Sequence, residues 1–160
     1  MLHWPNPRRL AWVYATTNLG GDGNFGQIGL YNNSTGPHVL CVHDVIVDPA
    51  QNGAPGGALL IQGKLSGTDF RPIPAFTGEA VPVGLATGGE SVTQPTFSFM
   101  ANLSTEWTQS ARPWPTVFLQ PGWSMLWSQA TASSDFGLSF LYEWRWAWEF
   151  PVIPNSPYDL

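Results

Sequence analysis

Charged residues are scarce in this sequence. They make up 11% of the 160 residues, and Lys64 is the single lysine, whereas a typical soluble domain is about 25% charged. The formal net charge is -5 at pH 7. Nucleic-acid binding requires clustered Lys and Arg side chains that neutralise phosphates, so the composition argues against a nucleic-acid partner.

The same scarcity bears on solubility. A lone monomer is usually kept soluble by many charged side chains of both signs. This chain combines few such groups with 14% aromatic residues, including nine tryptophans. We therefore expect other subunits to cover part of its surface. The alternative is a monomer whose surface is built from Ser, Thr, Asn, Gln and Gly, and composition alone leaves both open.

Cysteine and long apolar runs are also nearly absent. Cys41 is the single cysteine, which excludes an intrachain disulfide and argues against a cysteine-based metal site. No segment approaches the roughly 20 apolar residues that cross a bilayer, and residues 1–10 lack the apolar core of a signal peptide. We expect no membrane partner, and synthesis in a reducing cytoplasm without a signal peptide.

The sequence also lacks amphipathic helices longer than two turns, and short β-rich runs separated by Gly- and Pro-rich turns take their place. The stretch 66–94 is expected to hold one or two short strands. About eight strands predict an all-β fold, a two-sheet antiparallel sandwich of jelly-roll type. The clearer predicted strands are Phe25–Asn32, Val39–Asp48, Ala58–Leu65, Thr96–Ala101, Thr116–Leu119, Ser124–Ala130 and Phe136–Phe150.

The two ends of the chain differ in composition from its middle. Residues 1–24 mix Pro, Arg and Trp, and the last ten residues carry three prolines, which oppose pairing in a central strand. We therefore expect an N-terminal arm over 1–24, a sandwich domain over 25–150 and a C-terminal arm over 151–160. The apolar residues expected to dock these arms on partners are Trp4, Trp12, Ile153 and Tyr158.

The most distinctive stretch is "FLYEWRWAWEF", in which every second residue is aromatic. Successive side chains of a strand point to opposite faces, so the pattern predicts one strand with an aromatic face. Such a face can be a core wall, a platform for sugar rings or a subunit interface. So much exposed apolar surface is rare on a monomer. We therefore expect the centre of the strand to belong to the core, and Trp148 and Phe150 to contact a neighbouring subunit or the C-terminal arm. The aromatic residues are Phe140, Tyr142, Trp144, Trp146, Trp148 and Phe150.

The sequence contains no recognised catalytic or cofactor-binding motif. Cys41 and His43 share a strand face but lie within an aliphatic run. We therefore expect Cys41 to be a small buried hydrophobic residue and His43 a half-buried histidine with satisfied hydrogen bonds, and not a catalytic pair. The densest group of potential metal ligands is His38, His43 and Asp44, and its spacing matches no standard metal site. The prediction is therefore no enzyme, no cofactor and no metal.

Two carboxylates near the end of the aromatic stretch deserve the same test. Glu143 and Glu149 lie on one strand face with Arg145 between them. A glycoside hydrolase needs two facing carboxylates at a defined separation. Ordinary ion pairing with Arg145 explains these two glutamates more simply, so we rank a small hydrolase last among the functional hypotheses.

Three segments taken together resemble a known family. They are "IGLYNNSTGPHVLCVHDVIV", "VFLQPGWSMLWSQA" and "LSFLYEWRWAWEF". Their order resembles that of small jelly-roll virion proteins of tailed bacteriophages, which decorate heads or form collars, fibres and tail attachments, commonly as trimers. The Pro-Gly turn before a late apolar strand is also similar to trimeric tumour-necrosis-factor-like jelly rolls.

The resemblance implies a non-enzymatic virion structural protein made in the host cytoplasm. Its implied partners are itself, as a homotrimer, and other virion proteins such as a major capsid or tail protein. The alternative is a carbohydrate-binding or receptor-binding module of a phage tail or fibre. Its platform for sugar rings would be formed by Trp107, Trp114, Trp123 and Trp127.

Overall fold

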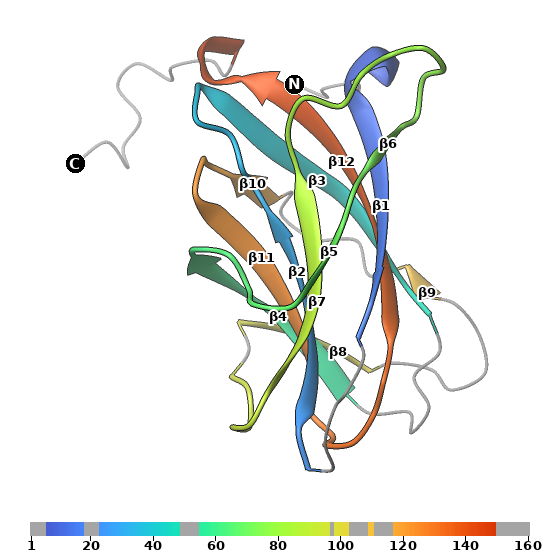
Figure 1. Cartoon of the computed structure of the whole chain (residues 1–160), viewed down its shortest axis with the longest axis vertical. Coiled ribbons are helices and arrows are strands. Elements are labelled where there is room, and N and C mark those ends of the chain that lie inside the picture. Colours follow the sequence, from blue (N-terminus) through green and yellow to red (C-terminus); the bar gives the residue numbers. More distant parts are fainter. Residues whose placement is uncertain are drawn as a thin grey trace.

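The computed structural model describes residues 6–17, 23–48, 55–96, 98–102, 109–110 and 117–149. Within these ranges the protein is all-β, with two antiparallel sheets of six strands each facing one another (Figure 1). The only helical elements there are the two 3-10 turns η1 (Pro7–Arg9) and η2 (Ala147–Glu149). The predicted antiparallel sandwich is therefore confirmed. None of the described helices has the length and apolar character needed to span a membrane.

The first sheet is built around the aromatic strand. Its strand order is β10-β3-β12-β1-β6, and β9 also pairs with β3. The two longest strands, β3 and β12, lie side by side in the middle because both carry nearly continuous apolar residues. The bounds are β1 (Leu10–Thr16), β3 (His38–Val47), β6 (Ile73–Pro74), β9 (Gln109–Ser110), β10 (Val117–Leu119) and β12 (Gly137–Trp146).

The second sheet has the order β5-β7-β2-β11-β4-β8. Its inner strands β2 and β7 are rich in glycine, which lets the sheets approach closely: a Cβ atom at Gly88 would collide with the carbonyl oxygen of Thr16. The stretch 66–94 holds three strands where one or two were expected. The bounds are β2 (Phe25–Tyr31), β4 (Pro55–Gln62), β5 (Thr68–Phe70), β7 (Leu85–Ser91), β8 (Phe99–Asn102) and β11 (Trp123–Gln129).

The hydrophobic core lies between the sheets, and β12 supplies its largest side chains. Phe140 and Tyr142 are completely buried, and Trp144 is 8% exposed. From the second sheet, Trp127 is completely buried against the same cluster. Aromatic side chains bury about 150–250 Å² each, so this wall of rings supplies much of the apolar burial that stabilises the sandwich.

The aromatic strand is shorter than the sequence pattern predicts. β12 ends at Trp146, and Ala147–Glu149 form η2, so Trp148 does not continue the strand. The chain turns here because the Ala147 amide donates to the Pro37 carbonyl and the Glu149 carboxylate accepts from the Trp146 amide. Phe150 lies outside the described residues.

The N-terminal arm predicted over residues 1–24 is also wrong in part. Residues 10–16 form β1, which pairs with β12 along its whole length and belongs to the first sheet. Alternate residues Ala11, Val13 and Ala15 are buried, since they point into the core. Trp12 is therefore a half-buried residue of an internal strand and not part of a docking arm. The other predicted docking residues, Trp4, Ile153 and Tyr158, lie outside the described residues.

Candidate functional site

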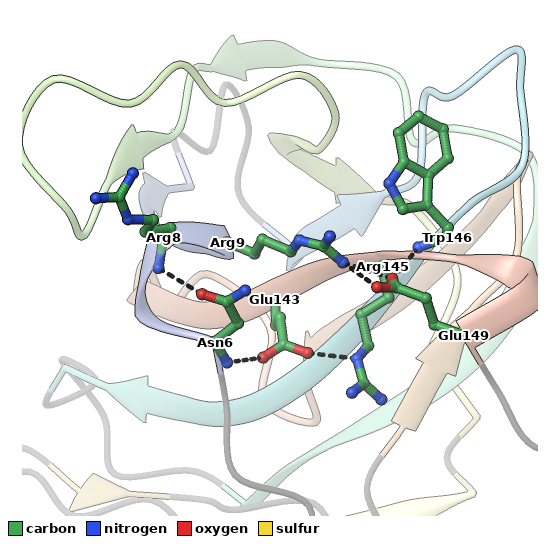
Figure 2. Close-up of polar contacts among 7 residues, drawn as sticks. All are labelled: Asn6, Arg8, Arg9, Glu143, Arg145, Trp146 and Glu149. Atoms are coloured by element: carbon green, nitrogen blue, oxygen red, sulfur yellow. Dashed lines mark hydrogen bonds and ion pairs between the residues drawn. The ribbon is translucent and has the colours of Figure 1, made fainter.

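Charged side chains from three separate segments meet where β12 ends (Figure 2). The segments are η1 with its preceding residue, the last residues of β12, and η2. Because the sequence has so few charged residues, their concentration at one end of the sandwich makes this cluster the first candidate site.

The deepest member of the cluster is Glu143, whose side chain is fully buried. One carboxylate oxygen is 2.7 Å from Nε of Arg145, and the other accepts a hydrogen bond of 2.6 Å from the backbone amide of Asn6. Arg145 is itself only 15% exposed. The alternation of β12 places Glu143 on the face opposite Tyr142 and Trp144, so this ion pair lies on the outer side of the first sheet.

The second ion pair joins the two ends of the described chain. Nη1 of Arg9 lies 2.5 Å from both carboxylate oxygens of Glu149, and one of those oxygens also accepts from the Trp146 amide at 2.7 Å. The hydrogen bond from Arg9 lowers the pKa of Glu149 below its usual range. Nearby, the side-chain oxygen of Asn6 caps η1 by accepting from the Arg8 amide.

Three aromatic rings lie beside these charges, and we call them the aromatic shelf: His38, Trp146 and Trp148. His38 faces Trp146 across the β3–β12 pair, with ring centroids 4.1 Å apart. Trp146 in turn stacks almost parallel on Trp148 at 4.8 Å. Trp148 is 69% exposed, so the shelf ends in an open aromatic face.

The chemistry of the cluster suits a contact that holds η1, β12 and η2 together better than it suits catalysis. A glycosidase general acid needs a carboxyl group that keeps its proton, which requires a raised pKa, whereas the pKa of Glu149 is lowered. Burial raises the pKa of the nearby Cys41 thiol to about 12, which disfavours the nucleophilic thiolate. In the described part of the chain, no three His, Cys, Asp or Glu side chains come together to hold a metal ion.

A second candidate lies at the edge of the sandwich where β10 faces β4 and β11. Leu60, Phe118 and Trp123 are 46%, 51% and 38% exposed, and we call these three residues the apolar edge patch. With Leu119 and Gln120 they line a cavity of about 240 Å³. Large apolar side chains that cluster on a surface mark interaction sites more often than isolated ones do.

The buried Asn32 fixes the turn that presents this patch. Its side-chain amide donates to the carbonyls of His38 and Leu119, at 2.9 and 2.8 Å. Its backbone pairs with both Gly122 and Trp123. The patch therefore rests on a loop that is held rigidly against the body of the sandwich.

The four tryptophans expected to form a sugar platform do not share one surface. Trp127 is completely buried in the core and cannot contact a ligand, so its assignment to the platform is wrong. It points inward because it alternates with Ser128 along β11. Trp123 is partly exposed, as above, and Trp107 and Trp114 lie outside the described residues.

The sequence patterns did not identify several of the residues at these sites. Arg9 contacts Glu149, which is 140 residues away in the sequence, and Asn6 contacts Glu143, which is 137 residues away. No local sequence pattern encodes either contact. Phe118 could have been noticed as the outward residue of a short strand whose next residue, Leu119, is buried.

Comparison with known proteins gave no match to a family model, to a curated protein or to a solved structure.

Proposed function

We propose that the protein is a non-enzymatic structural component of a tailed-phage virion, which assembles as a homotrimer and attaches to other capsid or tail subunits. The observation that carries the proposal is the apolar edge patch on a chain with few charges. The sequence resemblance to small jelly-roll virion proteins supplies the biological context.

The proposed sandwich type is the jelly roll, and the strand pairing supports it. Such a fold arises when a ribbon of nested antiparallel pairs folds over, so that successive pairs fall in opposite sheets. With β5, β6, β7 and β9 set aside as additions, eight strands remain. They pair first with last and so on inward: β1 with β12, β2 with β11, β3 with β10 and β4 with β8. The first and third pairs belong to one sheet, and the second and fourth to the other.

The self-assembly proposal rests on what the patch exposes. Leu60, Phe118 and Trp123 present apolar surface at one edge of the sandwich, and covering it removes that surface from water, worth about 25 cal/mol per Å². A closed ring covers the patch on every copy without leaving an open end that grows into fibres. A closed trimer would bury the patch on every copy and would leave no open end.

The attachment proposal rests on where the chain leaves the sandwich. The Arg9–Glu149 ion pair and the bond from the Asn6 amide to Glu143 hold the first and last described segments together. The described residues therefore begin at Asn6 and end at Glu149 at the same end of the sandwich, where Trp148 is 69% exposed. One partner surface can then engage both of them at once.

Sedimentation of the purified protein tests self-assembly. We expect a trimer of the 17.5 kDa chain at micromolar concentration, and Phe118→Glu should convert it to a folded monomer. Ile73→Glu is the matched control, because Ile73 is 65% exposed on β6, at the opposite edge of the first sheet from β10. A parent protein that stays monomeric on concentration contradicts the proposal.

A truncation tests attachment. Removal of residues 151–160 should spare folding of the sandwich but weaken binding to the parent particle, measured by co-sedimentation with particles that lack the protein. Undiminished particle binding by the truncated protein would rule out a docking role for this segment.

We propose as the alternative function a carbohydrate- or receptor-binding module, for which Trp123 is the one partly exposed tryptophan of the predicted platform among the described residues. Its ring is partly exposed beside Gln120 in the 240 Å³ cavity, an arrangement that suits stacking on one sugar. A glycan array of the parent and of Trp123→Ala distinguishes the two functions. Glycan signals that the parent gives and Trp123→Ala loses would favour the carbohydrate-binding function.

A further inference from the structure

The outer face of the second sheet carries a cavity that none of the preceding functions uses. In the second sheet, β2, β11 and β4 lie between β7 and β8. The connection from β7 to β8 therefore crosses three strands, and the amide of Ser98 reaches the Ala58 carbonyl of β4 at 2.9 Å. We call residues 91–96 of this connection the strap. Between the strap and the sheet lies a cavity of about 310 Å³.

The floor of the cavity holds a buried polar pair. Gln27 of β2 and Ser128 of β11 are direct cross-strand neighbours, and they are 8% and 3% exposed. The side-chain amide of Gln27 donates to the Ser128 hydroxyl at 3.0 Å. An amide side chain carries a second N–H hydrogen and an oxygen acceptor beyond this one bond, and Gln27 lines the cavity, so a ligand there can use both.

The rest of the lining is partly apolar and partly hydroxylic. Leu126 and Leu59, which are paired across β11 and β4, adjoin the polar pair on the floor. The strap adds hydroxyl and amide groups around Pro95. Two hydrogen bonds within the strap fix its turn: the Ser91 hydroxyl donates to the Thr93 carbonyl at 2.9 Å and accepts from the Thr93 amide at 3.2 Å.

The chemistry of this lining selects among ligands. None of the nine lining residues is ionisable, so a charged ligand would be desolvated without an opposite charge to pair with. A purely apolar ligand would leave the buried Gln27 amide unsatisfied. A ligand with many neutral hydroxyl groups and one apolar face fits both parts. Six lining residues carry a hydroxyl or an amide: Gln27, Ser91, Thr93, Gln94, Thr96 and Ser128.

We propose that this cavity binds a neutral saccharide unit, with its hydroxyl groups on the Gln27–Ser128 pair and its apolar face on Leu59 and Leu126. The volume lies at the lower end of the roughly 300–1,000 Å³ typical of ligand pockets, which suits one or two sugar rings. This activity goes beyond the structural role proposed above, and its site is separate from the apolar edge patch.

Ligand-observed NMR on the purified full-length protein tests the proposal. The probes are glucose, galactose, N-acetylglucosamine, lactose and maltose, with glucuronic acid as the charged counterpart of glucose. We expect saturable binding of at least one neutral sugar in the millimolar range, and at least tenfold weaker binding of glucuronic acid. Absence of saturation by every neutral sugar overturns the proposal.

Variants locate the binding. Gln27→Leu keeps the size of the side chain but removes its amide, and it should weaken sugar binding at least tenfold. Gln94→Ala, on the exposed strap, carries little risk to folding and should weaken binding severalfold. Trp123→Ala is the control, because it changes the other cavity and should leave binding unchanged. Sugar binding that survives both cavity variants, in protein that melts like the parent, overturns the proposal.

The two proposals fail separately. If no sugar binds but the parent is a trimer that Phe118→Glu dissociates, only the saccharide site is wrong. If sugar binds through Gln27 and the parent is a monomer, the assembly proposal is wrong and the saccharide site stands.

Discussion

The hydroxyl of Tyr142 donates a hydrogen bond of 2.8 Å to the backbone carbonyl of Val83. Tyr142 is completely buried on β12, and burial raises its pKa. Val83 belongs to the loop before β7 and is also buried. The next residue, Gly84, has φ +108 and no room for a Cβ atom, which would collide with the tyrosine hydroxyl. One phenol thus anchors a loop of the second sheet to the central strand of the first.

The Tyr142→Phe variant should be less stable than the parent by about 1–3 kcal/mol, because the buried Val83 carbonyl loses its partner. Urea denaturation followed by tryptophan fluorescence measures the change. Tyr14→Phe is the comparison at the surface: the Tyr14 hydroxyl bonds to Asp48, but Tyr14 is 49% exposed, so water can replace the lost bond and the loss of stability should be smaller. Equal stability of Tyr142→Phe and the parent would show that the bond contributes nothing.

The buried Glu143–Arg145 pair predicts an asymmetry between single and double variants. Glu143→Ala should cost about 3–5 kcal/mol, since it removes the carboxylate that lies 2.7 Å from Nε of Arg145, a guanidinium only 15% exposed. Replacing both residues with Met should recover much of that loss, because no buried charge remains. Chemical denaturation of the three proteins measures the effect. A double variant as unstable as Glu143→Ala would contradict the explanation.

The Arg9–Glu149 pair predicts a small dependence of stability on pH. The pKa of Glu149 is lower in the folded protein than in the unfolded chain. Its contribution is therefore present above the unfolded pKa and disappears as pH falls through the folded pKa. Both side chains are about a third exposed, so the contribution is at most about 1 kcal/mol. Glu149→Gln should be slightly less stable than the parent at pH 7, and the difference should vanish in acid or in high salt.

The tryptophans along and after β12 should show a graded loss of stability on replacement by alanine. Trp144 is 8% exposed in the core, so its loss should cost about 3–5 kcal/mol. Trp146, half-buried in the aromatic shelf, should cost less, and Trp148, which is 69% exposed, should cost least. Denaturation midpoints measure the series. A Trp144→Ala protein as stable as the parent would contradict the core assignment.

The sequence predicts those parts of the fold whose pattern is local. The alternation of Phe140, Tyr142 and Trp144 indicates an aromatic strand face, and all three residues are buried. The end of that strand is not predictable in this way, because it depends on the Glu149 carboxylate and the Pro37 carbonyl, which reach the strand from outside it.

Other features depend on contacts between distant segments. The strand over 10–16 carries a period-two pattern, yet its inward residues include the small Ala11 and Ala15, which give a weak hydrophobic signal beside neighbouring Pro and Arg. The Gln27–Ser128 pair joins residues 101 positions apart. Each residue alone is an ordinary polar residue on the outward face of a strand, and only the sheet register reveals the site.

The pairing of β1 with β12 has a mechanical consequence. Leu10 lies opposite Glu143, so a pulling force applied between the segments that precede Asn6 and follow Glu149 acts on adjacent ends of two antiparallel strands. Such a load opens the ladder like a zipper, one hydrogen bond at a time, and does not shear all of the bonds together. The Arg9–Glu149 ion pair and the hydrogen bond from the Asn6 amide to Glu143 are the contacts at the loaded end. Tension between these two ends would therefore separate β1 from β12 before it loads the rest of the first sheet.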